Sequence, residues 1–133
     1  MLQSSNLIAE RYALSNTLWA GHKRRKAEHK AKGNGFGYGL VTRADAHTRT
    51  LSARYWKDGS EILVCQEHLG LNPRKLTPRE CANLQGFPKN YKIGLVSDTQ
   101  MYKQFGNSVA VPVISAISKE ILRSLNIVNG KLS

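Results

Sequence analysis

Glycine occupies every second position between residues 33 and 39, in the run GNGFGYG, and this alternation limits the fold more than any other feature of the chain. A helix cannot continue through it, because each glycine loses more backbone entropy on folding than any other residue. A helix is predicted before it, over 16–32, with Ser15 or Asn16 as the N-cap and Gly33 as the end. The glycine run therefore divides a helical N-terminal segment from a non-helical one.

The segment after the glycine run favours strands. Asp58-Gly59 lies between two β-prone stretches, TRTLSARYW and SEILVC, and such a dipeptide is typical of a tight hairpin turn. Residues 36–65 are therefore predicted to form a small antiparallel sheet. For the glycine run itself, a plain turn and a loop that approaches a phosphate chain closely are equally consistent with the residues.

The second half of the chain is predicted to be helical. Thr77-Pro78-Arg79-Glu80 has the pattern of a capping box with proline at the first helical position, and Ser97-Asp98-Thr99-Gln100 is a second box. A last helix carries an apolar stripe made of Val109, Val113, Ile117, Ile121 and Leu125, widened by Ile114 and Leu122. The predicted fold class is α+β, with a basic N-terminal helix, a small antiparallel sheet and further helices.

The charge of the chain points to a polyanionic partner. Twenty Lys and Arg face nine Asp and Glu, which gives a formal net charge of +11, and six of the basic side chains lie in residues 22–32. Nucleic acid is the commonest partner for such a surplus. The run at 22–32 is either a solvated helix face or a surface that contacts phosphates. Further basic residues downstream, among them Arg43, favour phosphate contact.

Several functional classes are excluded by what the sequence lacks. No apolar run is long enough to span a membrane, and the first residues do not resemble a signal peptide. The histidines and the two cysteines have no spacing that would gather a metal site, and no Ser-His-Asp arrangement is evident. Cys65 and Cys81 are predicted to pack rather than react, and a reducing, cytoplasmic location is expected.

Asn107-Ser108 forms the predicted turn before the last helix. A helix start presents free backbone N–H groups and a partial positive charge, which suits an anion or a carboxylate. Helix capping alone explains the two residues equally well.

Two segments carry a resemblance to a known family. Residues 74–88, RKLTPRECANLQGFP, and residues 100–113, QMYKQFGNSVAVPV, resemble the ninth and tenth signature motifs of bacterial cytosine-5 DNA methyltransferases. Upstream, LWAGHKRRKAEHKAKGNGFGYGLV and TRTLSARYWKDGSEILV are similar to the target recognition region of one branch of that family. The likeness covers roughly residues 14–125.

The resemblance implies a C-terminal portion of such an enzyme. The family's N-terminal two-thirds supplies a glycine-rich S-adenosylmethionine loop, a Pro-Cys-Gln nucleophile and a Glu-Asn-Val motif, and none has a counterpart here. Cys65 lacks the preceding proline. Some members are split into two polypeptides, and this chain resembles the small subunit, whose helices would dock on an α/β (Rossmann-like) core in a larger chain. The alternative is a free-standing DNA-binding module or the inactive remnant of a disrupted gene.

The resemblance also assigns roles within the chain. Residues 1–73 would be the target recognition region, and residues 74–133 would join the catalytic core of a restriction–modification enzyme that flips its target cytosine out of the duplex. No catalytic residue and no metal ligand is expected. Contacts to double-stranded DNA are expected from Lys23, Arg24, Arg25, Lys32, Gly35, Arg49, Thr50, Ser52, Arg54 and Lys57. S-adenosylmethionine, shared with the partner, would contact Asn107, Ser108 and Val109, while Arg79 and Glu80 would brace the recognition region.

Overall fold

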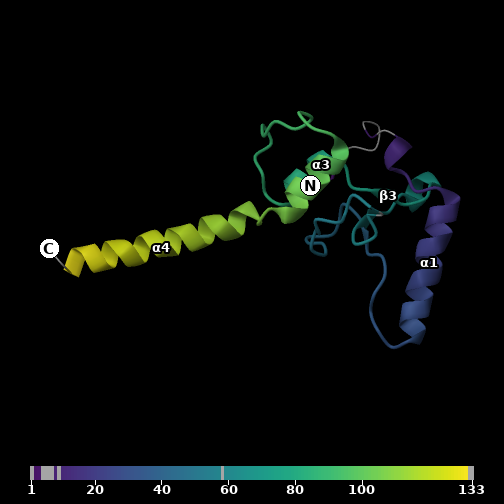
Figure 1. Ribbon diagram of the computed structural model, residues 1–133, viewed down its shortest axis with the longest axis horizontal. Coiled ribbons are helices and arrows are strands. Elements are labelled where there is room, and N and C mark those ends of the chain that lie inside the picture. Colours follow the sequence, from purple (N-terminus) through teal and green to yellow (C-terminus); the bar gives the residue numbers. More distant parts are fainter. Residues whose placement is uncertain (1, 4–7, 9, 58, 132–133) are drawn as a thin grey trace.

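The computed structural model describes residues 2–3, 8, 10–57 and 59–131, with the backbone alone at 128–131 (Figure 1). Its helices and strands are, in chain order, η2 (Glu10–Tyr12), α1 (Asn16–Ala31), β1 (Leu40–Val41), β2 (Leu63–Val64), η3 (Glu67–Leu69), β3 (Arg74–Lys75), α2 (Pro78–Leu84), α3 (Asp98–Asn107) and α4 (Val111–Lys131). Helices α1 and α4 lie at opposite ends of the molecule, with the sheet, α2 and α3 between them (Figure 1).

The predicted starts of α1, α2 and α3 are confirmed. The Ser15 hydroxyl accepts a hydrogen bond from the Leu18 N–H at 3.2 Å and begins α1, and Gly33, with a φ of +73°, follows its end. The capping box of α2 is complete, because the Thr77 hydroxyl accepts from the Glu80 N–H and the Glu80 carboxylate accepts from the Thr77 N–H. Ser97 caps α3 in the same position. Local side-chain chemistry thus sets where these helices start.

The sheet differs from the prediction. Its order is β1-β2-β3, with β1 and β2 parallel and β2 and β3 antiparallel, so it is mixed rather than antiparallel, and each strand is two residues long. The predicted hairpin is wrong, because residues 53–57 form turns; Asp58 lies outside the described residues. The reason is Tyr55, whose buried hydroxyl donates to the Ile62 carbonyl and accepts from the Leu76 N–H at 2.8 Å. These bonds turn the segment into the core instead of along a strand.

One apolar core draws on both halves of the chain. Its buried members are Tyr12, Val41, Leu51, Tyr55, Ile62, Val64, Leu76, Cys81, Ala82, Met101, Tyr102 and Phe105. A large apolar side chain contributes about 1.5–3 kcal/mol when it is fully buried. The segments on either side of residue 73 are therefore stabilised by the same cluster.

Helix α4 extends away from this core (Figure 1). It is joined to the body near its start, where the Val111 N–H donates to the Gln85 carbonyl at 2.7 Å. The predicted apolar stripe is present and exposed along the helix, from Val113 through Ile117 and Ile121 to Leu125. Val109 lies in the turn before α4 rather than on it. Every helix in the described part of the chain is too short or too polar to cross a lipid bilayer.

Candidate nucleic-acid interface

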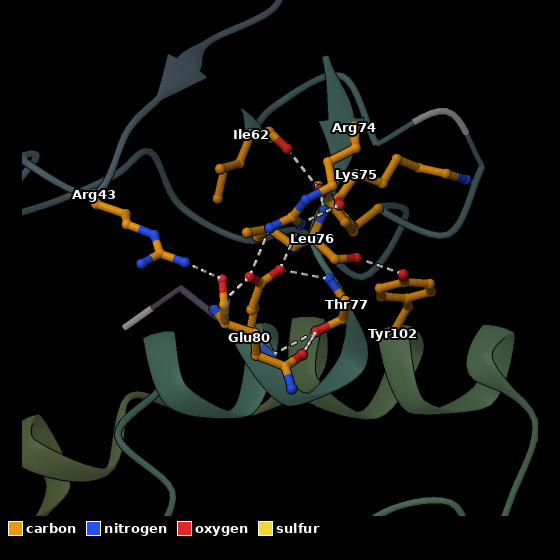
Figure 2. Close-up of polar contacts among 10 residues, drawn as sticks. Arg43, Ile62, Arg74, Lys75, Leu76, Thr77, Glu80 and Tyr102 are labelled. Atoms are coloured by element: carbon orange, nitrogen blue, oxygen red, sulfur yellow. Dashed lines mark hydrogen bonds and ion pairs between the residues drawn. The ribbon is translucent and has the colours of Figure 1, made fainter. Parts of the chain in front are cut away.

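A buried ion pair anchors the middle of the molecule. Arg74 Nη1 lies 2.8 Å from Glu80 Oε2 and Nη2 lies 2.9 Å from Oε1, and the two side chains are 4% and 0% exposed (Figure 2). Such two-point contacts match the planar guanidinium to the carboxylate. The pair joins β3 to the first turn of α2, so it holds this edge strand of the sheet against α2.

The same network reaches the start of the chain. The Gln3 N–H donates to Glu80 Oε1 at 2.8 Å, and the Gln3 side-chain oxygen accepts from the Thr77 hydroxyl at 2.6 Å. Arg43 Nη2 donates to the Gln3 carbonyl at 2.8 Å, as Figure 2 shows beside the ion pair. The polar groups around Glu80 therefore connect the loop after β1 with α2.

Helix α1 presents its basic side chains to solvent and fixes the glycine run at the same time. Tyr38 packs edge-on against Trp19, with ring centroids 4.7 Å apart, and the Lys26 ammonium lies 4.1 Å from the Tyr38 ring centroid. A Cβ at Gly37, whose φ is +142°, would lie 2.8 Å from Lys26 Cγ. The glycine run thus forms a loop that packs closely along α1, and the absence of a side chain at Gly37 permits this approach.

A groove of about 550 Å³ opens between α1, this loop and the segment before β2. Arg49 Nη1 donates to the Gly37 carbonyl at 2.7 Å and holds one wall in place. The lining residues are Arg25, His29, Gly35, Phe36, Gly37, Arg49, Thr50, Ser60 and Glu61. Four residues predicted to contact DNA, namely Arg25, Gly35, Arg49 and Thr50, are therefore brought to one site.

The other predicted DNA contacts lie outside this lining. Lys23, Arg24 and Lys32 are exposed on α1 or at its end, and Arg54 and Lys57 are exposed on the turns after the recognition segment. Ser52 is half-buried, and its hydroxyl donates to Glu61 Oε1 at 2.6 Å. The exposed side chains extend the basic surface beyond the groove, and their role stays a prediction.

A second groove, of about 570 Å³, lies where the α3–α4 turn meets residues 46–51. Ser108 and Val109 line it, whereas Asn107 is exposed beside it. The Gln85 side-chain amide donates to the Phe105 carbonyl at 2.9 Å and so supports the turn. The Ser108 hydroxyl donates to the Phe105 carbonyl at 2.8 Å, and the neighbouring side chains of Asn107 and Val109 are exposed.

The cysteines and the predicted bracing residues have clear positions. Burial, and secondarily the charge of Glu80, raises the pKa of the Cys81 thiol far above its usual range. Cys65 is half-buried at the end of β2. Arg79 Nη2 donates to the Tyr91 carbonyl at 2.6 Å, within the second half of the chain. Among the described residues, no group of His, Cys, Asp and Glu is arranged to hold a metal ion.

Among the residues of these sites, Arg74, Glu61 and Gly106 were assigned no functional role from the sequence. An arginine three residues before the N-cap of a capping box is a weak signal for an ion pair, and only its burial shows that it needs the Glu80 carboxylate. Glu61 is an acidic residue in a basic chain, and only the fold brings it beside Arg49. Gly106 directly precedes Asn107 and Ser108, which are the residues of that motif with polar side chains that could bind a ligand.

Comparisons with known proteins agree on one family. The family model described as C-5 cytosine-specific DNA methylase matches residues 1–123. Type II methyltransferase M.SsoII of Shigella sonnei is 58% identical over 119 residues, which are 90% of this chain and 31% of that protein. Type II methyltransferase M.NlaX of Neisseria lactamica is 56% identical over 122 residues, 92% of this chain and 38% of that protein. The chain thus spans about a third of the length of these relatives.

The fold is similar to that of solved methyltransferases. The crystal structure of S. pombe Dnmt2 methyltransferase superposes with a TM-score of 0.73 at 19% sequence identity, over 94% of this chain and 41% of that one.

Proposed function

The chain belongs to the C-5 cytosine-specific DNA methylase family, and on that premise we propose that it is the C-terminal, DNA-recognition portion of a DNA (cytosine-5-)-methyltransferase. In this proposal the chain reads the target site and completes the S-adenosylmethionine site. The remaining two-thirds of the enzyme, which carries the chemistry, is a larger partner chain. The Type II relatives favour a restriction–modification system in the cytoplasm.

The observation that carries the proposal is the exposed apolar face of α4. Ile117 and Ile121 are more than half exposed, at 51% and 55%, and their neighbours on the stripe are exposed as well. A contiguous apolar surface of this kind marks an interface, because leaving it in water costs free energy. A helix of 21 residues is about 31 Å long, enough to cover one face of a catalytic domain. A chain that corresponds to the two-thirds of the relatives not matched here is the partner that fits this apolar face.

The basic surface supports the DNA-reading half of the proposal. The groove beside α1 joins Arg25, Arg49 and Thr50 from separate segments, and α1 adds a row of exposed Lys and Arg. Phosphate contacts from such side chains fix register on a duplex, while side chains in the groove reach base edges. The chain would therefore hold the duplex while the target cytosine is flipped into the partner's pocket.

The chemistry of cytosine explains why the chain would depend on a partner. C5 of cytosine becomes nucleophilic only after a thiolate adds to C6, so an exposed, activated cysteine is required. Cys81 is buried with a raised pKa, and Cys65 is half-buried behind the Val41 carbonyl, which accepts its N–H at 2.9 Å. In this proposal the chain binds and orients, and the partner supplies the nucleophile.

The residues of the α3–α4 turn fit one side of S-adenosylmethionine, which supplies an electrophilic methyl group when it is bound. The turn offers an exposed amide on Asn107 and an exposed apolar side chain on Val109, beside the groove that Ser108 lines. An amphiphilic small molecule is held by this mixture of polar and apolar contacts. Residues 46–51 form the other wall of this groove, and the remaining contacts to S-adenosylmethionine would come from the partner.

Transfer of labelled methyl groups from S-adenosylmethionine to duplex DNA tests the proposal. The partner is the part of M.SsoII that lies outside the segment matched by this chain, and the arms are this chain alone, the partner alone and the mixture. Methylation only in the mixture is the expected result. Methylation by the partner alone, unchanged when this chain is added, would contradict it. DNA binding without methylation in any arm, with both chains folded, would favour the free-standing DNA-binding module.

A further inference from the structure

Glu61 is the acidic residue of an otherwise basic groove. It lies two residues before β2, and it lines the groove between α1 and the glycine run together with Arg25, His29 and Arg49. Acidic side chains repel the phosphates of DNA, so a carboxylate at this position weakens a purely electrostatic contact. A carboxylate in a groove that binds DNA is explained if it accepts a hydrogen bond that DNA donates.

The two oxygens of the Glu61 carboxylate differ. Oε1 accepts a hydrogen bond from the Ser52 hydroxyl at 2.6 Å, which fixes the direction of the side chain. Oε2 is buried and has no hydrogen-bond partner among the described residues. An unpaired buried carboxylate oxygen is destabilising, because it has lost its water and gained no donor. Glu61 lines the groove, so a molecule bound there can supply the donor when the carboxylate turns toward it.

The neighbouring groups indicate which donor it is. Arg49, bound through Nη1 to the Gly37 carbonyl, places a guanidinium in the lining of the same groove. In the major groove of DNA, arginine pairs with the O6 and N7 acceptors of guanine, and a carboxylate accepts from the N4 amino group of cytosine. Adenine also carries an amino group, but its N7 acceptor lies beside it and repels a carboxylate. A guanidinium and a carboxylate together therefore match a G·C pair.

We propose that Glu61, oriented by Ser52, reads the N4 amino group of a cytosine in the recognised DNA site and so helps to determine its sequence. The proposal rests on the DNA-recognition role proposed above and adds the specificity residue and the base that it contacts. In this proposal Arg49, which lines the same groove, contacts the paired guanine.

The test measures which duplexes the full chain binds. A pool of random duplexes is bound to the chain at fixed salt, and the bound fraction is sequenced for the wild type, Glu61→Gln and Glu120→Gln. The control, Glu120→Gln, removes the same charge from the exposed surface of α4, where Glu120 Oε1 lies 3.9 Å from Arg123 Nη1. The wild type and the control are expected to prefer a G·C pair at one position by about tenfold or more. Glu61→Gln is expected to lose most of that preference while binding the pool at least as tightly.

A change on the DNA gives a second measurement that requires no variant. N4-methylcytosine still pairs with guanine, and its methyl group replaces the amino hydrogen that faces the major groove. At the preferred position it is expected to lower wild-type affinity by about tenfold. Binding that is unaffected there, or a preference that Glu61→Gln retains, would overturn the inference and leave the DNA-recognition role intact. If the chain binds no duplex in a salt-dependent way, the proposed function fails and the inference fails with it.

Discussion

Gly106 of α3 lies directly against the backbone of Ser52, with no room for a methyl group between them. A Cβ on Gly106 would collide with the Ser52 carbonyl oxygen and lie 2.5 Å from the Ala53 nitrogen. This contact joins the helix that precedes the α3–α4 turn to the segment that carries Thr50. The groove beside α1 and the groove at the α3–α4 turn share Arg49 and Thr50 in their linings, and the contact between Gly106 and Ser52 packs the segment that carries them against α3.

Replacement of Gly106 by alanine is expected to destabilise the chain by about 1–3 kcal/mol, because an added methyl in a closely packed site forces the backbone to move. Gly21→Ala is the matched control, since Gly21 also lies in a helix and a Cβ there meets nothing within 4 Å. That variant should gain up to about 1 kcal/mol from helix propensity. Urea unfolding of both variants measures the difference, and equal midpoints would contradict the packing interpretation.

The Arg74–Glu80 ion pair gives a second stability prediction. Glu80→Gln leaves the buried guanidinium without its counter-charge, and breaking a buried pair in this way costs about 3–5 kcal/mol. The exposed pair of Glu120 and Arg123 is the control, because Glu120→Gln should change the free energy of unfolding by less than about 1 kcal/mol. Denaturant unfolding of the two variants is the measurement, and a small effect at Glu80 would mean that water reaches the pair.

The tyrosine hydroxyls predict a loss of stability at alkaline pH. Burial raises the pKa of Tyr55 well above its usual value, and burial also raises the pKa of Tyr102, whose hydroxyl donates to the Leu76 carbonyl at 2.6 Å. Below about pH 10 both phenols are neutral whether the chain is folded or not, so stability is unaffected. Above it the unfolded chain loses protons that the folded chain keeps, and the free energy of unfolding falls.

Tyrosinate absorbance and circular dichroism followed together over rising pH measure this effect. Both phenols are expected to ionise only as the helical signal is lost, and Tyr55→Phe should make the free energy of unfolding depend less steeply on pH. Ionisation of Tyr55 or Tyr102 in a chain that keeps its helical signal would show that these hydroxyls are not buried.

The starts of the helices were predictable here and the pairing of the strands was not, and the reason is the range of the contacts. Ser15 and Thr77 cap their helices through groups three residues away, which the sequence displays directly. Strand β1 instead depends on the pairing of Leu40 with Leu63, and the Asp58-Gly59 signal was overridden by the buried hydrogen bonds of Tyr55. A local turn signal is weak when a residue beside it has partners in the core.

The residues of the candidate site also fall into two groups, those that the sequence predicted and those that it did not. Arg49 and Thr50 were predicted from charge and from the resemblance, because an exposed contact to DNA depends mainly on residue type. Glu61 and Arg74 were not, because their importance depends on burial and on a partner distant in the sequence. Such residues become visible only when the fold shows what surrounds them.

The two cysteines should behave differently towards a thiol reagent. The buried Cys81, with its raised pKa, is expected to react only when the chain unfolds, whereas the half-buried Cys65 should react in the folded chain. Cys65→Ser should abolish that reaction and still support methylation in the mixture with the partner. Loss of turnover in a Cys65→Ser chain that remains folded would show that this thiol has a role in the reaction.

The exposed face of α4 permits a separation of folding from assembly. Ile117→Glu places a charge in the middle of the apolar stripe, where the side chain is 51% exposed and contributes little to the core. The free energy of unfolding of the isolated chain is therefore expected to change by less than about 1 kcal/mol, as for other surface substitutions. Methylation in the mixture should fall at least tenfold, because the charge would have to be buried against the partner. Lys119→Glu places a negative charge on the polar side of α4, four residues from Arg123, and should leave methylation unchanged. Equal methylation by both variants would mean that the stripe does not contact the partner, and a reduced unfolding midpoint for Ile117→Glu alone would mean that α4 packs on its own chain in solution.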